Sequence, residues 1–297
     1  MRSGIVAVVG RANAGKSTLI NVMVGEKVAI VSPKPQTTRD RILGILTRED
    51  YQIVFEDTPG IYKASSLLNS RMQKSTELAA KNVDAILFVI DAHDGLKEED
   101  VQNLSKYATG QIPLILVLSK TDIMPKENIP ALVKSFENTK NITKIISLSA
   151  RRGKNIKKLE EELVKLLPEG DFIYDENTIS DRSERFMISE IMREKILLKY
   201  DKEIPHGVAI IINTFELQEN DVYDINLDIV CEKQNHKAII IGKGGKALKE
   251  VCSFARQSME KFLGKKVFLT AYVKVRNDWR NNVSELKEYG YSESDLF

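Results

Sequence analysis

The sequence predicts an α/β domain with a mixed, mostly parallel sheet, followed by a smaller α+β domain. In the first 170 residues, continuous apolar runs alternate with helical patterns. Strands that are apolar on both faces are typical of a parallel sheet covered by helices on both sides. Beyond residue 182 the order changes to a helix followed by two long extended runs. At 297 residues the chain is long enough for two separate cores.

The elements of the first domain follow from these patterns. Apolar strands are predicted at residues 5–9, 85–90, 113–118 and 144–148. Helices are predicted at residues 18–24, 96–107, 128–136 and 156–167. The runs 41–47 and 51–55 flank a turn-prone Arg-Glu-Asp and predict a hairpin, and a short extended run is expected at 27–32.

The second domain has a different order of elements. A helix is predicted at 183–200, followed by extended runs at 208–217 and 223–231, a helical stretch that ends at 263, and a strand at 266–275. We therefore divide the chain into a domain at 1–170, a polar linker at 171–182 and a domain at 183–297. The composition of the acidic, aromatic tail that begins at Trp279 does not indicate a role for it.

Charge and composition exclude several classes of protein. The net charge is only +2, but residues 237–276 hold ten basic and two acidic residues between acidic neighbours, which is typical of a local polyanion-binding surface. Two isolated cysteines and three scattered histidines argue against a zinc site. No apolar run approaches the roughly 18 residues of a membrane span. With free thiols and no signal peptide, we expect a cytoplasmic protein.

One glycine-rich segment lies between the first strand and the first helix, with the spacing G-x-x-x-x-G-K-S. Backbone N–H groups of such a loop surround phosphate oxygens, the helix dipole adds positive potential, the lysine reaches the β- and γ-phosphates, and the serine hydroxyl ligates Mg²⁺. The motif therefore predicts binding of a nucleoside triphosphate. Its residues are Gly10, Arg11, Ala12, Asn13, Ala14, Gly15, Lys16 and Ser17.

Three further segments follow strands, where ligands bind in open α/β sheets. Asp57 is placed to hold Mg²⁺ through water, and the Gly60 N–H to face the γ-phosphate. Asp122 could accept both N–H groups of the guanine edge, a pattern that adenine lacks. The segments are Asp57-Thr58-Pro59-Gly60, Ser119-Lys120-Thr121-Asp122, and Ser149-Ala150-Arg151-Arg152-Gly153.

Together these segments resemble the G-motifs of translation-factor-class GTPases, and the first domain resembles Era-type GTPases over its full length. The resemblance implies that Thr38, in Pro35-Gln36-Thr37-Thr38-Arg39, completes the Mg²⁺ shell in the GTP state. Ser119 stands where the family has Asn, which removes an amide that commonly ties the base loop to the P-loop. Ile61 replaces a Gln that orients water in some GTPases, so slow hydrolysis is expected, with Lys16, Thr38, Gly60 and Asn13 as the catalytic set. Asn13 resembles a P-loop Asn that binds K⁺ in several relatives.

The segment Ile239-Ile240-Ile241-Gly242-Lys243-Gly244-Gly245-Lys246 resembles the I-G-x-G-G core of KH domains. A glycine loop between two helices can pack on a nucleic-acid backbone while its lysines face phosphates. The preceding isoleucines can line a groove for unstacked bases. The predicted RNA-binding residues are Ile240, Ile241, Gly242, Lys243, Gly244, Gly245 and Lys246.

With the second domain included, the resemblance to Era-type GTPases with a type II KH domain covers nearly the whole chain. It implies a monomeric GTP/GDP switch with Mg²⁺ that binds the 3′ end of 16S ribosomal RNA and assists 30S subunit assembly and rRNA processing. It also implies peripheral contact with the inner face of the cell membrane as a lesser alternative. For the helix at 183–200, packing on the adjacent sheet is favoured over a membrane surface.

Two other functions remain open at this point. The protein could be a passive RNA binder in which nucleotide is only structural. It could also be an ATPase, an alternative that Ser119 motivates. Hydrolysis with and without RNA separates the first alternative from the switch, and competition between GTP and ATP separates the second.

Overall fold

The computed structural model describes residues 1–60, 66–137 and 139–291. The chain forms two compact units. The first unit comprises Met1–Val31, Thr38–Lys63 and Met72–Asp181, and the second comprises Ser32–Thr37, Ala64–Arg71 and Arg182–Phe297. Each unit has its own core and is described by itself.

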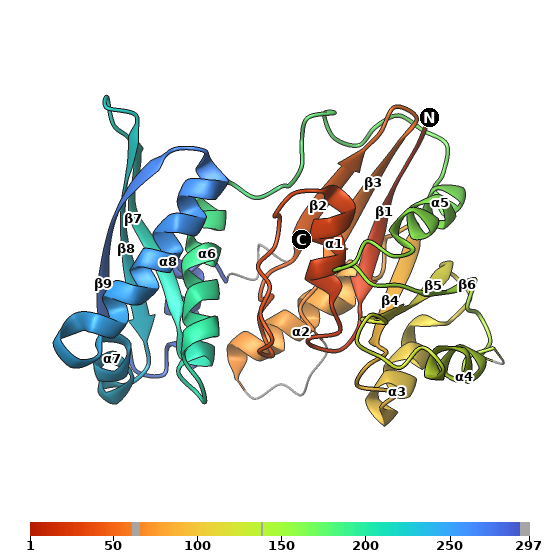
Figure 1. Ribbon diagram of the computed structural model, residues 1–297, viewed down its shortest axis with the longest axis horizontal. Helices are drawn as coiled ribbons and strands as arrows, with labels where there is room; N and C mark the ends of the chain where they lie inside the picture. The colour runs from red at the N-terminus through yellow and green to blue at the C-terminus, as the bar shows by residue number, and fades with distance from the viewer. Residues whose placement is uncertain (61–65, 138, 292–297) are drawn as a thin grey trace. The chain divides into compact units, whose positions relative to one another are not determined.

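The first unit is built on a six-stranded sheet in the order β2-β3-β1-β4-β5-β6 (Figure 1). Neighbouring strands are parallel except for the β2–β3 hairpin, which is antiparallel. This confirms the predicted mixed, mostly parallel sheet. The strands are β1 (Arg2–Val9), β2 (Ile42–Thr47), β3 (Tyr51–Asp57), β4 (Ala85–Asp91), β5 (Leu114–Ser119) and β6 (Lys144–Ser147).

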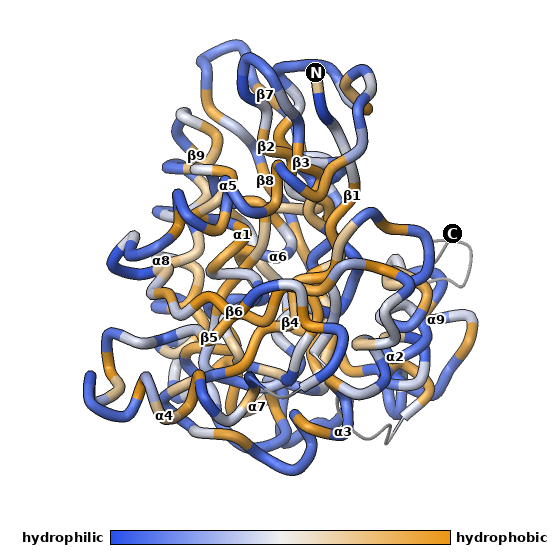
Figure 2. Tube along the Cα trace, turned by 90° about the vertical axis from the view of Figure 1, so that its right-hand side faces the viewer, coloured by the Kyte–Doolittle hydropathy of each residue, from blue (hydrophilic) through white to orange (hydrophobic). Residues whose placement is uncertain are grey.

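Helices cover both faces of this sheet. On one face, α1 (Lys16–Val24) and α5 (Ile156–Leu166) pack on inward residues of the strands. On the other, α3 (Glu98–Tyr107) and α4 (Asn128–Lys134) enclose a second apolar layer. The central strands β4 and β5 are therefore buried on both sides, and they appear as continuous apolar segments in Figure 2. Their carboxyl ends deliver the loops that carry the predicted motifs.

Two local features of the first unit differ from the prediction. The run 27–32 forms no strand, because the Asn21 side chain takes the place of a ladder partner: its amide accepts from the N–H groups of Val28 and Ala29 and donates to the Ala29 carbonyl, at 2.8–3.0 Å. Helix α2 (Leu67–Ala79) is absent from the elements that the sequence predicts. Its buried side includes the polar Ser75 and Thr76, which weaken the apolar periodicity.

The polar segment after α5 follows the edge of the first sheet. The fully buried Gln52 side chain accepts from the N–H groups of Ile173 and Tyr174 and donates to the Tyr174 carbonyl. Further along, the Ile45 N–H of β2 donates to the Ile179 carbonyl at 2.9 Å. Residues 171–181 thus lie against the edge of the first sheet.

The second unit contains a three-stranded sheet in the order β7-β8-β9, with β8 and β9 parallel. Helices α6 and α8 lie on one face of it (Figure 1). The order helix, two strands, two helices, strand agrees with the predicted α+β domain. Its elements are α6 (Glu184–Lys199), the 3₁₀ turn Pro205–Gly207, β7 (Ala209–Leu217), β8 (Val222–Cys231), α7 (Gln234–Ile241), the turn Lys243–Gly245, α8 (Lys246–Leu263) and β9 (Lys266–Val275).

Helix α6 packs in the core of the second unit. Ser183 caps its first turn by accepting from the Phe186 N–H. Six apolar side chains of the helix are buried: Met187, Ile188, Ile191, Met192, Ile196 and Leu197. Leu198 of the same helix is 51% exposed, so most but not all of the apolar side chains considered for a membrane surface are buried. Among the described residues, no helix is long and apolar enough to cross a membrane.

The aromatic tail completes the second unit. A 3₁₀ turn (Trp279–Asn281) leads into α9 (Val283–Glu288). Trp279 is fully buried, and its indole N–H donates to the Gly207 carbonyl at 2.9 Å. Tyr289 and Tyr291 pack against its ring at centroid distances of 5.5 and 6.0 Å. The tail is thus a structural part of this unit.

Candidate nucleotide and nucleic-acid sites

The glycine-rich loop joins β1 to α1, as predicted. Gly15 caps the helix, and Lys16 is its first residue. The Lys16 side chain is buried, and its ammonium group donates to the carbonyl oxygens of Gly10 and Arg11 at 3.1 Å. Burial lowers the pKa of Lys16 to about 8, and the nearby Asp57 carboxylate opposes that shift. A phosphate group offers such a buried cation a better partner than two carbonyls do.

Ser17 of α1, Asp57 at the end of β3 and Thr38, in the segment before β2, converge beside the loop. The Ser17 hydroxyl donates to Asp57 Oδ2 at 2.7 Å and lies 3.0 Å from the Thr38 hydroxyl. The Thr38 hydroxyl is 3.4 Å from the same carboxylate oxygen. Burial raises the pKa of Asp57 to about 6, although Lys16 and the two hydroxyls lower it. All three predicted oxygen ligands therefore lie together.

The segment that follows β3 packs directly on the P-loop. The Thr58 hydroxyl donates to the Val8 carbonyl at 2.8 Å. A Cβ atom at Gly60 would lie only 2.6 Å from Ala12 Cα, so only glycine allows this approach. The segment is also tied to α2, because the Thr76 hydroxyl donates to the Pro59 carbonyl at 3.0 Å. Ile61, which the sequence analysis singled out, lies outside the described residues.

Ser119 contradicts one expectation. Its hydroxyl lies 2.6 Å from the Ala14 carbonyl and 3.0 Å from the Ile90 carbonyl. The tie between base loop and P-loop is therefore kept by a serine hydroxyl rather than removed with the amide. A single hydroxyl proton serves both acceptors, and the shorter distance favours Ala14.

The two loops after β5 and β6 are joined to one another. The Thr121 hydroxyl donates to the Leu148 carbonyl at 2.9 Å. The Ser149 hydroxyl, hydrogen-bonded to Asp122, is the main cause that lowers the pKa of that exposed carboxyl. The Lys120 ammonium is 2.6 Å from Asp91, and its stem passes Gly15. The structure thus places the predicted base-binding residues beside the P-loop, with Ala150 adjacent to Ser149.

Two ion pairs that support these loops are not predicted by the sequence. Arg11 of the P-loop pairs at 2.7 Å with the buried Asp100 in the first turn of α3. Asp91, at the end of β4, pairs with Lys120. Asp100 lies within the helix predicted at 96–107, and nothing in the sequence spacing relates it to Arg11. Asp91, in contrast, follows a strand directly, which is a signal that could have identified it.

The predicted nucleic-acid loop lies between α7 and α8. Gly242 has φ +70°, and a Cβ atom there would lie 2.6 Å from Ala247 Cβ, so this tight turn requires glycine. Gly244 is exposed in the turn, and the side chains of Lys243 and Lys246 lie at the protein surface. The prediction that Ile240 lines a groove for bases is wrong, because its side chain is fully buried in the core of the second unit. The neighbouring Ile239 is 51% exposed.

Fold and sites define a class of protein: a P-loop GTPase domain followed by a KH domain. Comparison with known families agrees. Residues 5–120 match the model of the 50S ribosome-binding GTPase, and residues 203–280 match the KH domain.

Curated relatives extend the similarity over nearly the whole chain. GTPase Era of Caldanaerobacter subterraneus subsp. tengcongensis is 44% identical over 98% of both chains. GTPase Era of Alkaliphilus oremlandii is 46% identical over 98% of this chain and 99% of its own. The chain belongs to the Era family of GTPases.

Solved structures of Era agree with this assignment. A point variant of Aquifex aeolicus Era bound to GDP·AlF4⁻ has a TM-score of 0.94 and 36% identity, covering 98% of this chain and all of the other. An Era complex with MgGDPNP and nucleotides 1506–1542 of 16S ribosomal RNA has a TM-score of 0.94 and 37% identity, covering 98% and 99%.

Proposed function

We propose that this GTPase is a switch that binds the 3′ end of 16S ribosomal RNA, assists assembly of the 30S subunit and takes part in rRNA processing. The observation that carries the proposal is that Ser17, Thr38 and Asp57 converge beside the P-loop in a chain that also has an accessible G-K-G-G turn in a basic segment. The Era complex that contains 16S ribosomal RNA supports the choice of RNA. Within the chain we assign residues 1–170 to the GTPase domain, 171–182 to the linker and 183–297 to the KH domain.

In this proposal the P-loop holds the phosphates and a magnesium ion. The loop N–H groups and Lys16 bind the β- and γ-phosphates, and Gly60 contacts the γ-phosphate. Ser17 and Thr38 offer hydroxyl ligands to Mg²⁺, and Asp57 holds its water. The donor set fits a hard cation, since Asp57 Oδ1 is buried with no hydrogen-bond partner among the described residues. When bound, Mg²⁺ neutralises charge that develops on the phosphates.

Guanine is assigned to the loops after β5 and β6. Asp122 accepts from the two N–H groups of the Watson–Crick edge, and the Lys120 stem packs along the base. The backbone N–H of Ala150 meets the guanine O6. The contacts of Ser119 with Ala14 and of Thr121 with Leu148 hold these groups in place.

RNA is assigned to the turn between α7 and α8. Lys243 and Lys246 face the RNA phosphates, and Ile241 contributes apolar surface. The backbone of the turn packs on the RNA backbone at Gly242, Gly244 and Gly245. Because neither lysine is buried, both can neutralise phosphates without a structural cost to the fold.

Adjacent residues connect the nucleotide site to the second unit. Thr38, a ligand for Mg²⁺ in this proposal, belongs to the first unit, whereas Thr37 belongs to the second. Within the second unit the Thr37 carbonyl accepts from Arg193, a buried residue that is also paired with Glu190. Loss of the γ-phosphate would release Thr38 and thereby disturb the Thr37–Arg193 contact. If RNA binds the GTP state and the GDP state with different affinities, hydrolysis would then change how tightly RNA is bound.

Binding of a fluorescent RNA with the 16S 3′-end sequence tests the proposal. We expect tighter binding with GDPNP and Mg²⁺ than with GDP, and single-turnover GTP hydrolysis that changes when this RNA is added. Equal RNA affinities with GDPNP and GDP, together with a hydrolysis rate that RNA does not change, would reject the switch. The protein would then be a passive RNA binder.

Two matched variants locate the RNA site. Gly244 and Gly264 both have positive φ and open space where a Cβ atom would lie, but only Gly244 lies in the G-K-G-G turn. Gly244→Asp should weaken RNA binding at least tenfold while GTP binding is kept. Gly264→Asp should leave RNA affinity within about twofold.

Three finer assignments complete the proposal. Asn13, exposed in the P-loop, contributes to a K⁺ site beside the phosphates. The protein acts as a monomer in the cytoplasm. Peripheral membrane contact gains little support from α6, because six of its apolar residues lie in the core and Leu198 is the exposed large apolar side chain of the helix.

A further inference from the structure

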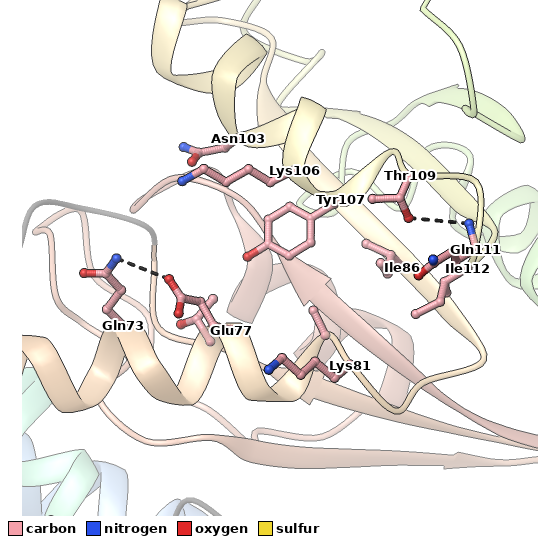
Figure 3. Close-up of a pocket in the computed structure, with 12 residues that line it drawn as sticks. Gln73, Glu77, Lys81, Ile86, Asn103, Lys106, Tyr107, Thr109, Gln111 and Ile112 are labelled. Carbon is pink, nitrogen blue, oxygen red and sulfur yellow. Dashed lines mark hydrogen bonds between the residues drawn. The ribbon is translucent and has the colours of Figure 1, made fainter.

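A cavity of about 420 Å³ lies in the first unit between α2, α3 and the loop that leads into β5 (Figure 3). Its size falls in the range of roughly 300–1,000 Å³ that is typical of small-molecule sites. None of its lining residues belongs to the P-loop or to the base-binding loops. It is therefore separate from the nucleotide site.

The interior of the cavity is apolar and carries one aromatic ring. Ile86 of β4 is buried at its floor, and Ala80, Ile112 and the ring of Tyr107 are half-buried around it. Phe88 supports Tyr107 from behind, with ring centroids 6.0 Å apart. Burial, with a contribution from Glu77, raises the pKa of Tyr107 to about 12, so its hydroxyl remains a donor at neutral pH. These surfaces suit a flat, apolar body.

The mouth of the cavity carries more positive than negative charge. Lys81 and Lys106 are exposed there, and neither ammonium group forms an ion pair within the described parts of the chain. The carboxylate among the lining residues, Glu77, is 3.4 Å from the Gln73 amide (Figure 3). Two unpaired cations against one carboxylate favour an anionic group on the ligand.

A buried amide adds a second, independent observation. Asn103 lines the cavity and is only 8% exposed, yet its side chain makes no hydrogen bond to any described residue. The amide atoms of Asn103 are not fully enclosed, so they stay accessible to a molecule that enters the cavity. A polar ligand atom could therefore hydrogen-bond this amide.

We propose that this cavity binds a small organic anion with a planar apolar body, such as an aromatic carboxylate. The body packs on Tyr107 and the isoleucines, while Lys81 and Lys106 bind the anionic group and Asn103 hydrogen-bonds a polar atom. Because the site shares no residue with the nucleotide loops, it is filled while GDP is bound.

The test uses the full chain with saturating GDP and Mg²⁺, and 2-naphthoate as the probe, followed by ligand-detected NMR titration. We expect a Kd of about 1 mM, as is usual for a ligand of this size. Lys81→Gln and Lys106→Gln should each weaken binding about threefold to fivefold, and the double variant about tenfold. Both lysines are exposed, so these substitutions leave the fold intact.

Two controls make the result specific. Lys134→Gln, on the exposed face of α4, should leave the Kd unchanged. The uncharged analogue 2-naphthamide should bind the unsubstituted protein as weakly as 2-naphthoate binds the double variant. The proposal is overturned if 2-naphthoate shows no binding at about 10 mM or if excess GDP displaces it. It is also overturned if 2-naphthoate binds the lysine variants, and 2-naphthamide binds the unsubstituted protein, as tightly as 2-naphthoate binds the unsubstituted protein.

Discussion

The hydroxyl of Ser119 lies 2.6 Å from the carbonyl oxygen of Ala14, which joins the base-binding loop to the P-loop through a single hydrogen bond. Ser119 is 3% exposed, so this hydrogen bond is shielded from bulk water. In the proposed guanine site, this hydroxyl takes the place of the amide that the resemblance to Era-type GTPases leads us to expect here.

Ser119→Ala should therefore weaken GDP binding about fivefold to thirtyfold, because the Ala14 and Ile90 carbonyls lose their buried donor. Isothermal titration calorimetry measures the change. Ser105→Ala removes an exposed hydroxyl from α3 and serves as the control. An unchanged affinity in Ser119→Ala would mean that the hydroxyl plays no part in holding the two loops together.

The proposed cation site predicts a salt effect on turnover. Hydrolysis should be faster in KCl than in NaCl, since a K⁺ ion beside the phosphates would supply positive charge in the transition state. Asn13→Ala should remove this difference between the rates in KCl and in NaCl. Phosphate release under multiple-turnover conditions checks both statements, and equal rates of the unsubstituted protein in the two salts would reject the site.

Nucleotide binding should depend on pH through Lys16. Its pKa is about 8 in the free protein, so a rising pH removes the proton that a phosphate-bound ammonium needs. Affinity for GDP should fall about fourfold between pH 7 and pH 8.5.

Calorimetry in two buffers with different ionisation heats distinguishes this cause from others. At pH 8 about half a proton should be taken up on binding, and at pH 7 nearly none. Proton uptake that is the same at both pH values would assign the effect to another group.

Trp279 should be a major source of stability in the second unit. Trp279→Ala should lower the free energy of unfolding by about 3–5 kcal/mol, because it leaves a cavity and removes the donor to Gly207. Urea denaturation followed by far-ultraviolet circular dichroism measures the loss. Phe254→Ala is the control: that ring is 54% exposed, so the change should stay below about 0.5 kcal/mol. Comparable losses in both variants would contradict the role given to Trp279.

Strong local patterns make most of the fold predictable. The strands β4 and β5 are apolar up to their last residues, Asp91 and Ser119, so their burial and their parallel pairing follow from the sequence. Helix α2 is not predicted because the polar residues Ser75 and Thr76 occupy buried positions of the helix. The buried Thr76 hydroxyl donates to the carbonyl of Pro59, which is distant in the sequence. Local periodicity carries no information about such a partner.

The sites are predictable in residue type more than in geometry. The spacing of the P-loop motif correctly brings Ser17 and Lys16 to the start of a helix. The spacing cannot show that the short Ser119 side chain reaches the P-loop as the longer Asn side chain would. That contact depends on how closely the backbones of the two loops approach. Ile240 illustrates the same limit: three consecutive isoleucines precede the G-K-G-G turn, and only the packing of α7 determines which of them faces inward.

The backbone that runs along β2 has a practical consequence for dissecting the protein. Without residues 171–181, the outer strand of the first sheet would present unpaired amide and carbonyl groups to solvent, and strands of that kind add to one another between molecules. A truncated GTPase domain should therefore stop after Asp181 rather than after Gly170, because the shorter fragment would self-associate through its open sheet edge.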